Sequence, residues 1–131
     1  MSSPDEIVRA FVQGWNVPDP DPDQLSAYFA EDVVYHNIPL EPVVGRAAIR
    51  DAFAAFLKTF DATHWETHHQ VASGNVVMNE RTDTYHIGGR VGPVRVMGVF
   101  EVTDGLITGW RDYCDLAEAG RALDLQGGED A

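Results

Sequence analysis

The chain has a single cysteine and few basic residues. Cys114 has no second cysteine to pair with in the 131 residues, so no internal disulfide can form, as is usual in a reducing cytoplasm. Lysine and arginine number 9 against 21 aspartate and glutamate residues, which gives a formal net charge of −12. A protein of this charge is repelled by phosphate groups, so we expect neither nucleic acid nor a membrane as a partner.

Long apolar runs are also absent. No stretch approaches the roughly 20 residues needed to span a bilayer, and residues 1–6 lack the basic and apolar regions of a signal peptide. We therefore expect a cytoplasmic protein. A hydrophobic fraction of 44% is enough for one packed core, and the length predicts a single domain over residues 1–131, with residues 126–131 as a frayed tail.

The usual motifs of metal and phosphate sites are missing. His64 and His68 share one face of a predicted strand while His69 points away, and neither a nearby cysteine nor an HExxH motif accompanies them. The glycines of residues 88–92 precede no predicted helix, so they do not form a phosphate-binding loop. We predict no metal site and no cofactor.

The first half of the chain carries helical patterns. Residues 3–6 (Ser-Pro-Asp-Glu) combine a capping box with a proline at the first helical position, which predicts the start of a helix. A stiff acidic linker over residues 18–23 leads to a second, short helix. A strand over residues 33–37 and a third helix over residues 46–60 follow. The apolar residues of the short helix are Leu25, Tyr28 and Phe29.

The second half is predicted to consist of strands, with turns at Gly74-Asn75, at Gly88-Gly89 with Gly92-Pro93, and at Asp104-Gly105. The strands cover residues 64–72, 76–86, 94–103 and 106–116, and a short helix covers residues 117–125. Helices followed by long antiparallel strands indicate an α+β fold. We expect a curved, cone-like sheet that wraps around the N-terminal helices and encloses a deep pocket.

Asp112 is the most informative residue of the chain. It lies in the middle of the mostly apolar face of the strand over residues 106–116, because side chains alternate between the two faces of a strand. A buried carboxylate is costly unless it is paired or functional. Arg81 and Asp83 share a face of the strand over residues 76–86, and the planar fork of an arginine can hold two carboxylates at once.

Tyr35 and Asn37 also share a strand face, which completes a predicted polar cluster inside an apolar cavity. Two carboxylates near one guanidinium need not titrate alike: one stays ionised as a base, and the other is pushed towards the protonated form. Tyr35 and Asn37 could hold one water molecule together with Asp112. This arrangement suits attack of water on a carbon with protonation of a leaving oxygen. The cluster consists of Asp112, Asp83, Arg81, Tyr35 and Asn37.

Each of these residue pairs taken alone has a structural explanation. Arg-Asp pairs on strands are commonly solvated ion pairs or bridges that only hold the fold, and a tyrosine two residues before an asparagine indicates almost nothing. The functional interpretation gains its force because three alternating pairs occur in one chain, each with polar groups on an inward face.

Three short motifs, in this order and at these separations, resemble the limonene epoxide hydrolases: Tyr35-x-Asn37, Arg81-x-Asp83 and Trp110-Arg111-Asp112. The resemblance spans nearly the whole chain. It implies the cone-shaped α+β fold shared with ketosteroid isomerase and polyketide cyclases, and a homodimer packed through the sheet. It further implies a cofactor-independent epoxide hydrolase whose partners are a small-molecule epoxide and water, and whose product is a vicinal diol.

The family roles carry over residue by residue. Asp112 looks like the general base that activates water, and Tyr35 and Asn37 look like the groups that position this water. Asp83 looks like the general acid that protonates the epoxide oxygen. Arg81 looks like the bridge between the two carboxylates.

The predicted substrate pocket is less strongly specified. The resemblance implies that Trp110 forms the pocket wall beside the base. Cys114 and Tyr85 are expected to line the cavity where bulkier aliphatic and aromatic residues are typical of the family, and Gly98 is expected to leave extra room. Five further residues are candidates for the pocket wall, but each can also be explained as part of the hydrophobic core. For these residues we favour the core. They are Leu25, Phe29, Phe53, Leu57 and Val96.

Two other functions remain open from the sequence. The first is proton transfer of the ketosteroid-isomerase or polyketide-cyclase type, which also uses an aspartate in such a cone but does not call for an arginine shared by two carboxylates. The second is a non-catalytic small-molecule-binding module of the same fold, in which the acidic cluster is a structural network. The sequence does not specify the natural epoxide or the stereochemistry of ring opening.

Overall fold

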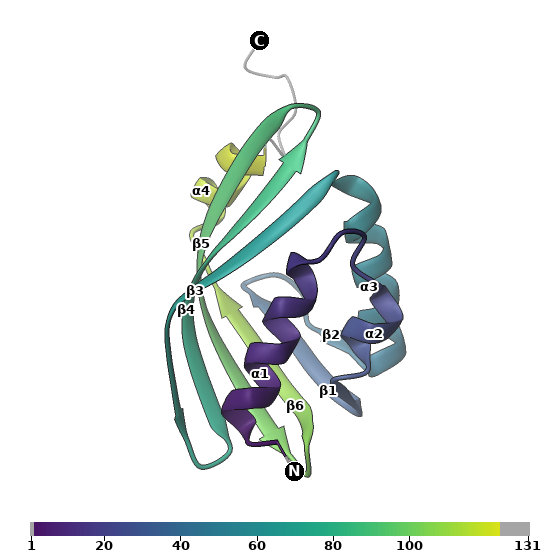
Figure 1. Ribbon diagram of the computed structural model, residues 1–131, viewed down its shortest axis with the longest axis vertical. Helices are drawn as coiled ribbons and strands as arrows, with labels where there is room; N and C mark the ends of the chain where they lie inside the picture. Colours follow the sequence, from purple (N-terminus) through teal and green to yellow (C-terminus); the bar gives the residue numbers. More distant parts are fainter. Residues whose placement is uncertain (1, 124–131) are drawn as a thin grey trace.

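A computed structural model describes residues 2–123 of the chain as a curved sheet with the first three α-helices on its concave side (Figure 1). The six strands run in the order β2-β1-β6-β5-β4-β3. All neighbours are antiparallel except β1 and β6, which are parallel. The elements are α1 (Pro4–Gln13), the 3-10 turn η1 (Gly14–Asn16), α2 (Pro22–Ser26), β1 (Phe29–Ile38), β2 (Val43–Val44), α3 (Arg46–Thr59), β3 (Ala62–Ser73), β4 (Val76–Ile87), β5 (Arg90–Thr103), β6 (Leu106–Tyr113) and α4 (Leu116–Leu123).

The predicted start of the first helix is confirmed by its cap, and α2 also begins at a capping side chain. At α1 the Ser3 hydroxyl accepts from the backbone N–H of Glu6 at 3.2 Å, and the Glu6 carboxylate accepts from the Ser3 N–H at 2.8 Å. At α2 the Asp21 carboxylate accepts from the Asp23 N–H at 2.9 Å. Each cap satisfies a donor that the first helical turn would leave unpaired.

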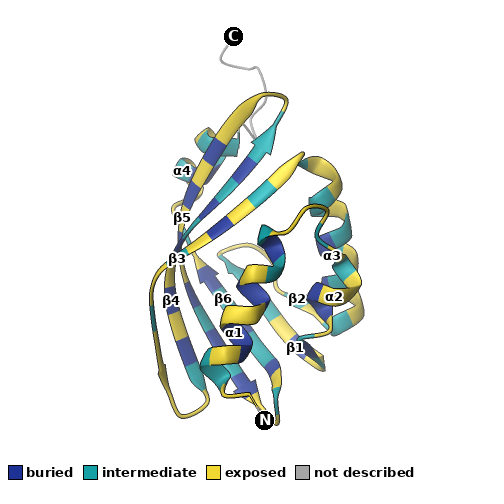
Figure 2. Ribbon diagram, viewed as in Figure 1, coloured by how far each residue is buried: buried dark blue, intermediate teal, exposed yellow. Residues whose placement is uncertain are grey.

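Alternation along the strands separates the core from the outer face of the sheet. In β4 every second residue, from Val77 through Arg81 to Tyr85, is buried, whereas the residues between them are exposed or half-buried (Figure 2). The hairpin between β5 and β6 turns at Asp104 and Gly105, with φ of 52° and 81°, as a tight two-residue turn requires. The predicted α+β class, with a curved mixed sheet around N-terminal helices, is confirmed.

Two elements differ from the sequence prediction near the N-terminal half. Tyr28 and Phe29 were assigned to the second helix together with Leu25, but α2 ends at Ser26, so Tyr28 lies in the turn after the helix and Phe29 begins β1. Phe29 there pairs with Ile107 of β6. The short strand β2, which pairs with Val34 and Tyr35, was not predicted because two residues carry no detectable period.

Two further differences concern the last strands. Gly92 and Pro93 were predicted in a turn, but both lie inside β5. The part of β5 before Met97 lies beyond the end of the β6 pairing, and a proline is tolerated where a strand has a neighbour on one side only. The predicted last strand is too long, because β6 ends at Tyr113 and Leu116 already begins α4. The predicted tail over residues 126–131 lies outside the described residues.

The core lies between the concave face of the sheet and the N-terminal helices. Phe11 of α1 is at its centre and makes edge-on contacts with Phe29 and Trp110, at centroid distances of 5.1 and 5.2 Å. Leu25 is also completely enclosed. Over residues 2–123, none of the helices has both the length and the apolar character that crossing a membrane requires.

Candidate active site

Arg81 is completely buried and bridges two buried carboxylates from neighbouring parts of the sheet. Its Nε and Nη2 donate to the two carboxylate oxygens of Asp83, at 3.1 and 3.0 Å. The same Nη2 donates to Asp112 Oδ2 at 3.0 Å. β5 lies between β4 and β6, so the Arg81 side chain crosses the inner face of β5 to reach Asp112. The three residues predicted to meet do so.

Two contacts of this cluster were not predicted. The remaining guanidinium nitrogen, Nη1, donates to Asn79 Oδ1 at 2.8 Å. Trp110 was assigned only to the pocket wall, but its indole Nε1 also donates to Asp112 Oδ1 at 2.7 Å. Alternation already placed Asn79 and Trp110 on the inward faces of their strands, which was the available signal. Charge-assisted hydrogen bonds of this kind hold both oxygens of Asp112 in fixed directions.

The parallel pairing of β1 with β6 brings Tyr35 and Asn37 to the cluster. Tyr35 lies opposite Trp110 in the register, and Asn37 lies opposite Asp112. The Tyr35 ring stacks on Trp110 at a centroid distance of 4.1 Å. All five residues of the predicted cluster therefore gather in one region, contributed by β1, β4 and β6.

A cavity of about 470 Å³ lies beside the cluster. Asp83, Asp112, Tyr35 and Asn37 contribute its polar wall, and most of the remaining wall is apolar. Of the predicted pocket residues, five line this cavity: Trp110, Cys114, Tyr85, Phe53 and Val96. Residues of α4, which the sequence analysis had not assigned to the pocket, also contribute: Leu116, Ala119 and Leu123.

Four predicted pocket residues lie elsewhere. Leu25 and Phe29 are enclosed in the core behind the cavity wall, and Leu57 of α3 lines a different hollow near the linker after α1. Gly98 lies beneath the cluster rather than beside the cavity. A Cβ atom there would be 2.5 Å from Arg81 Nη1, so the room that Gly98 leaves is occupied by the guanidinium and not by a ligand.

The members of the cluster differ in the pKa values that their surroundings give them. Burial raises the pKa of Asp83 to about 6 from its usual 3.8, although the charge and hydrogen bonds of Arg81 act in the opposite direction. Burial opposes the charge of Arg81, but Asp112 and Asp83 outweigh it and raise the pKa of the guanidinium. Burial likewise raises the pKa of the Tyr35 hydroxyl. Arg81 and Tyr35 therefore keep their protons at neutral pH, and Asp83 titrates close to it.

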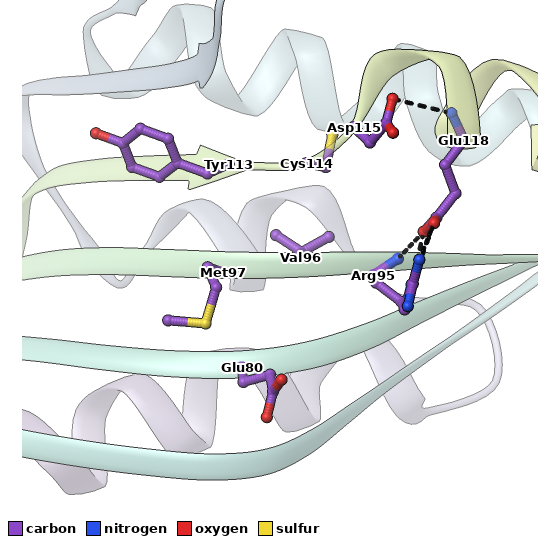
Figure 3. Close-up of a pocket in the computed structure, with 8 residues that line it drawn as sticks. All are labelled: Glu80, Arg95, Val96, Met97, Tyr113, Cys114, Asp115 and Glu118. Carbon is purple, nitrogen blue, oxygen red and sulfur yellow. Dashed lines mark hydrogen bonds and ion pairs between the residues drawn. The ribbon is translucent and has the colours of Figure 1, made fainter.

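Burial also raises the pKa of the Cys114 thiol, with the charge of Asp112 as the next cause. The reactive form of a cysteine is the thiolate, so this shift agrees with the interpretation of Cys114 as a wall residue. Cys114 and Val96 form part of a second hollow, on the outer side of the sheet, which Figure 3 shows in close-up. There Arg95 of β5 forms an ion pair with Glu118 of α4, which lowers the pKa of Glu118 to about 2.

The raised pKa of Asp83 has a consequence for stability. Because the folded protein binds this proton more tightly than the unfolded chain, Asp83 stabilises the fold below pH 3.8, and this contribution is lost as the pH rises through about 6. The variant Asp83→Asn cannot titrate at this position. Between pH 7.5 and pH 4.5, we expect wild type to gain about 2 kcal/mol in unfolding free energy relative to Asp83→Asn, measured by urea denaturation. An equal pH dependence in both proteins would contradict the assignment.

Comparison with known families and structures shows which family the chain belongs to. The model of the SnoaL-like domain matches residues 8–110 of the chain. Epoxide hydrolase EphG of Mycobacterium tuberculosis (strain ATCC 25618 / H37Rv) is 33% identical over 123 residues, covering 88% of this chain and 76% of the relative. The chain therefore belongs to the SnoaL-like domain family.

Solved structures extend the comparison to three dimensions. An LEH-like epoxide hydrolase from M. tuberculosis superposes with a TM-score of 0.78 at 32% identity, covering 92% of this chain and 88% of that one. The resemblance to limonene epoxide hydrolases is thereby confirmed. SalBIII, an epoxide hydrolase/cyclase-like enzyme with a role in pyran ring formation in polyether salinomycin, has a TM-score of 0.77 at 20% identity, with 88% and 92% covered. At this identity the match shows the fold alone.

Proposed function

We propose that this protein is an epoxide hydrolase that adds water to an epoxide in one step and releases a vicinal diol. The observation that carries the proposal is the pair of buried carboxylates, Asp83 and Asp112, held by one guanidinium at the wall of an apolar cavity. The names of the relatives, epoxide hydrolase EphG and an LEH-like epoxide hydrolase, support the same reaction class.

In the proposed reaction, Asp112 is the general base. It takes a proton from a water molecule held by Tyr35, Asn37 and Asp112, and the water oxygen attacks one epoxide carbon as the carbon–oxygen bond breaks. Asp83 gives its proton to the departing oxygen, which becomes the second hydroxyl of the diol. At the end of one turnover Asp112 carries the proton and Asp83 lacks it, so one proton must move from the first to the second before the next cycle.

The properties of the site support this division of roles. A general acid works best when its pKa lies near the working pH, and burial brings the pKa of Asp83 to about 6. Asp112 accepts hydrogen bonds from Arg81 and Trp110, which fix the directions of its two carboxylate oxygens at the cavity wall. Because the cavity wall is largely apolar, we propose a cyclic or terpene-like epoxide as the substrate.

Single-turnover hydrolysis of a small panel of cyclic epoxides in ¹⁸O-labelled water tests the proposal. Direct attack of water predicts that the diol of the first turnover already carries the label. An unlabelled first diol would mean that a protein carboxylate had supplied the oxygen, and absence of any diol across the panel would contradict the activity itself. Proton exchange of a ketone without epoxide hydrolysis would instead favour the isomerase-type reaction, although that reaction does not call for an arginine shared by two carboxylates.

We also propose that the protein is a homodimer packed through the outer face of the sheet. Apolar side chains lie in neighbouring register positions there: Val71 opposite Met78, and Met97 opposite Tyr113. They are between 43% and 67% exposed in the single chain, which is unusual for large apolar side chains that have no partner.

Light scattering after gel filtration tests the dimer. The measured mass of wild type should be twice the chain mass of 14.4 kDa. The variant Met97→Glu should shift towards the monomer because it buries a charge in the interface. As a control, Val17→Glu changes an exposed apolar residue of the N-terminal linker and should leave the mass unchanged. A monomeric wild type would refute the proposal.

A further inference from the structure

A chain of hydrogen bonds runs from the Arg81 guanidinium to the N-terminal helix. Asn79, itself buried, accepts from Arg81 Nη1 at 2.8 Å and donates through Nδ2 to Gln70 Oε1 at 3.1 Å. Gln70 in turn donates through Nε2 to Asp5 Oδ1 of α1 at 2.8 Å. The other carboxylate oxygen of Asp5 accepts from Arg9 at 3.0 Å. Elements β4, β3 and α1 are thus joined behind the catalytic cluster.

The groups at the two ends of this hydrogen-bonded series, Arg81 and Asp5, determine the direction of every hydrogen bond between them. A guanidinium can only donate, so the oxygen of Asn79 must face Arg81. An ionised carboxylate can only accept, so the amide nitrogen of Gln70 must face Asp5. The amide nitrogen of Asn79 is then left to meet the amide oxygen of Gln70. Neither amide can flip without placing two donors or two acceptors against each other.

The space for this arrangement is provided by Gly98. In the register of the sheet, Gly98 lies directly between Asn79 and Asp112 on the inner face. A Cβ atom at Gly98 would be 2.5 Å from Arg81 Nη1, 2.8 Å from Asp112 Oδ1 and 2.9 Å from Asn79 Oδ1. These separations are well below van der Waals contact, so a side chain at Gly98 and the observed position of the guanidinium exclude each other.

We propose that Asn79 is a positioning residue for catalysis: anchored through Gln70 to Asp5, it holds the Arg81 guanidinium over Gly98, so that Nη2 faces both Asp83 and Asp112. The inference rests on the proposed function, because it assigns Asn79 a part in the same site. Asn79 touches no reacting atom and acts through Arg81 alone.

The neutral charge of Asn79 is part of this role. An aspartate at the same place would also accept from Nη1, but it would add a third carboxylate to one guanidinium. The positive charge would then be shared more widely, and the like charge would raise the pKa of Asp83 further. An asparagine fixes the direction of the guanidinium without competing for its charge. A purely structural asparagine would show no such sensitivity to charge.

Variants of Asn79 test the inference, with the same changes at Asn75 as matched controls. Asn75 lies exposed in the turn between β3 and β4. Asn79→Ala should lower kcat by about 10- to 100-fold with little change in KM, because the guanidinium loses its direction. Asn79→Asp should move the alkaline limb of the kcat/KM profile to higher pH by about 1 unit, because Asp83, the proposed acid, then keeps its proton to higher pH. Asn75→Ala and Asn75→Asp should do neither.

A readout without substrate separates this inference from the proposed function. The titration of Asp83, followed by carboxyl ¹³C NMR, should shift to higher pH in Asn79→Asp and stay in place in Asn75→Asp. If wild type hydrolyses no epoxide but this shift is seen, the proposed function fails and the positioning of Arg81 stands. If wild type is active while the Asn79 variants keep both its kcat and its Asp83 titration, the inference is overturned.

A milder variant protects the test against misfolding. Gln70→Met leaves Asn79 in place but removes the acceptor of its amide nitrogen at the half-buried edge of the sheet. It should lower kcat severalfold while the variant keeps the circular dichroism spectrum of the folded wild type. Gly98→Ala, which pushes on the guanidinium from below, should reproduce the loss of Asn79→Ala. Wild-type kcat in both of these variants would likewise overturn the proposal.

Discussion

The variant Asp112→Asn should lose at least about 10³-fold in kcat while it keeps the fold of the wild type. General base catalysis contributes about 10²- to 10⁴-fold, and an amide cannot take a proton from water. The amide oxygen can still accept from Trp110 Nε1 or Arg81 Nη2, which now donate to the carboxylate at 2.7 and 3.0 Å. Initial rates of diol formation measure the loss, and circular dichroism verifies the fold.

Asp104→Asn is a suitable control for this experiment. It makes the same chemical change in an exposed turn next to β6, where asparagine tolerates the positive φ of 52°. The control should keep the wild-type rate. A folded Asp112→Asn variant that still forms diol at a comparable rate would remove Asp112 from the role of base.

The second large effect concerns stability. Arg81→Met should lower the free energy of unfolding at pH 7.5 by about 3–5 kcal/mol, because it leaves two buried carboxylates without their cation. The loss should shrink as the pH falls and protonation neutralises Asp83. Arg81→Lys should be nearly as harmful, since a single ammonium group cannot reproduce a fork that donates to Asp83, Asp112 and Asn79 together. Urea denaturation at several pH values measures both variants.

Arg50→Met provides the comparison for Arg81. Arg50 also forms an ion pair, with Asp23 at 2.7 Å, but its side chain is 41% exposed. Exposed pairs contribute less than about 1 kcal/mol, so this variant should unfold almost as wild type does. If Arg81→Met proved equally mild, the buried bridge would not hold the site together, and the shared guanidinium would lose its place in the proposed mechanism.

The alternation of strand residues was enough to predict which polar groups face inward. It placed Arg81 and Asp83 on the inner face of one strand and Asp112 on the inner face of another. Because a buried carboxylate needs a partner, the contact between Arg81 and Asp112 could then be predicted. Caps and turn residues predicted the boundaries at Ser3 and Gly105 for the same reason: each depends on chemistry within a few neighbouring residues.

What the sequence could not supply was the register between strands. The opposition of Gly98 to Asn79 on one side and Asp112 on the other depends on how β4, β5 and β6 align, and no local pattern contains this alignment. Gly98 was therefore interpreted as room for a ligand. The spacing of Phe29 from Leu25 fits a helical face, and it fits equally well a strand that follows a short helix. The sequence alone could not distinguish the two, and Phe29 was assigned to the helix.

The parallel contact between β1 and β6 has a consequence for how the molecule is made. The strand carrying Tyr35 and Asn37 is synthesised early, yet one of its two neighbours in the sheet is β6, the last strand of the described residues. Until β6 arrives, β1 and β5 each expose an unpaired edge on a growing polypeptide, and such edges invite aggregation. When β6 pairs with β1 and β5, both edges become paired, and Asp112 is brought to the site in the same step. Recovery of enzymatic turnover during refolding would thus mark the final, long-range step of folding.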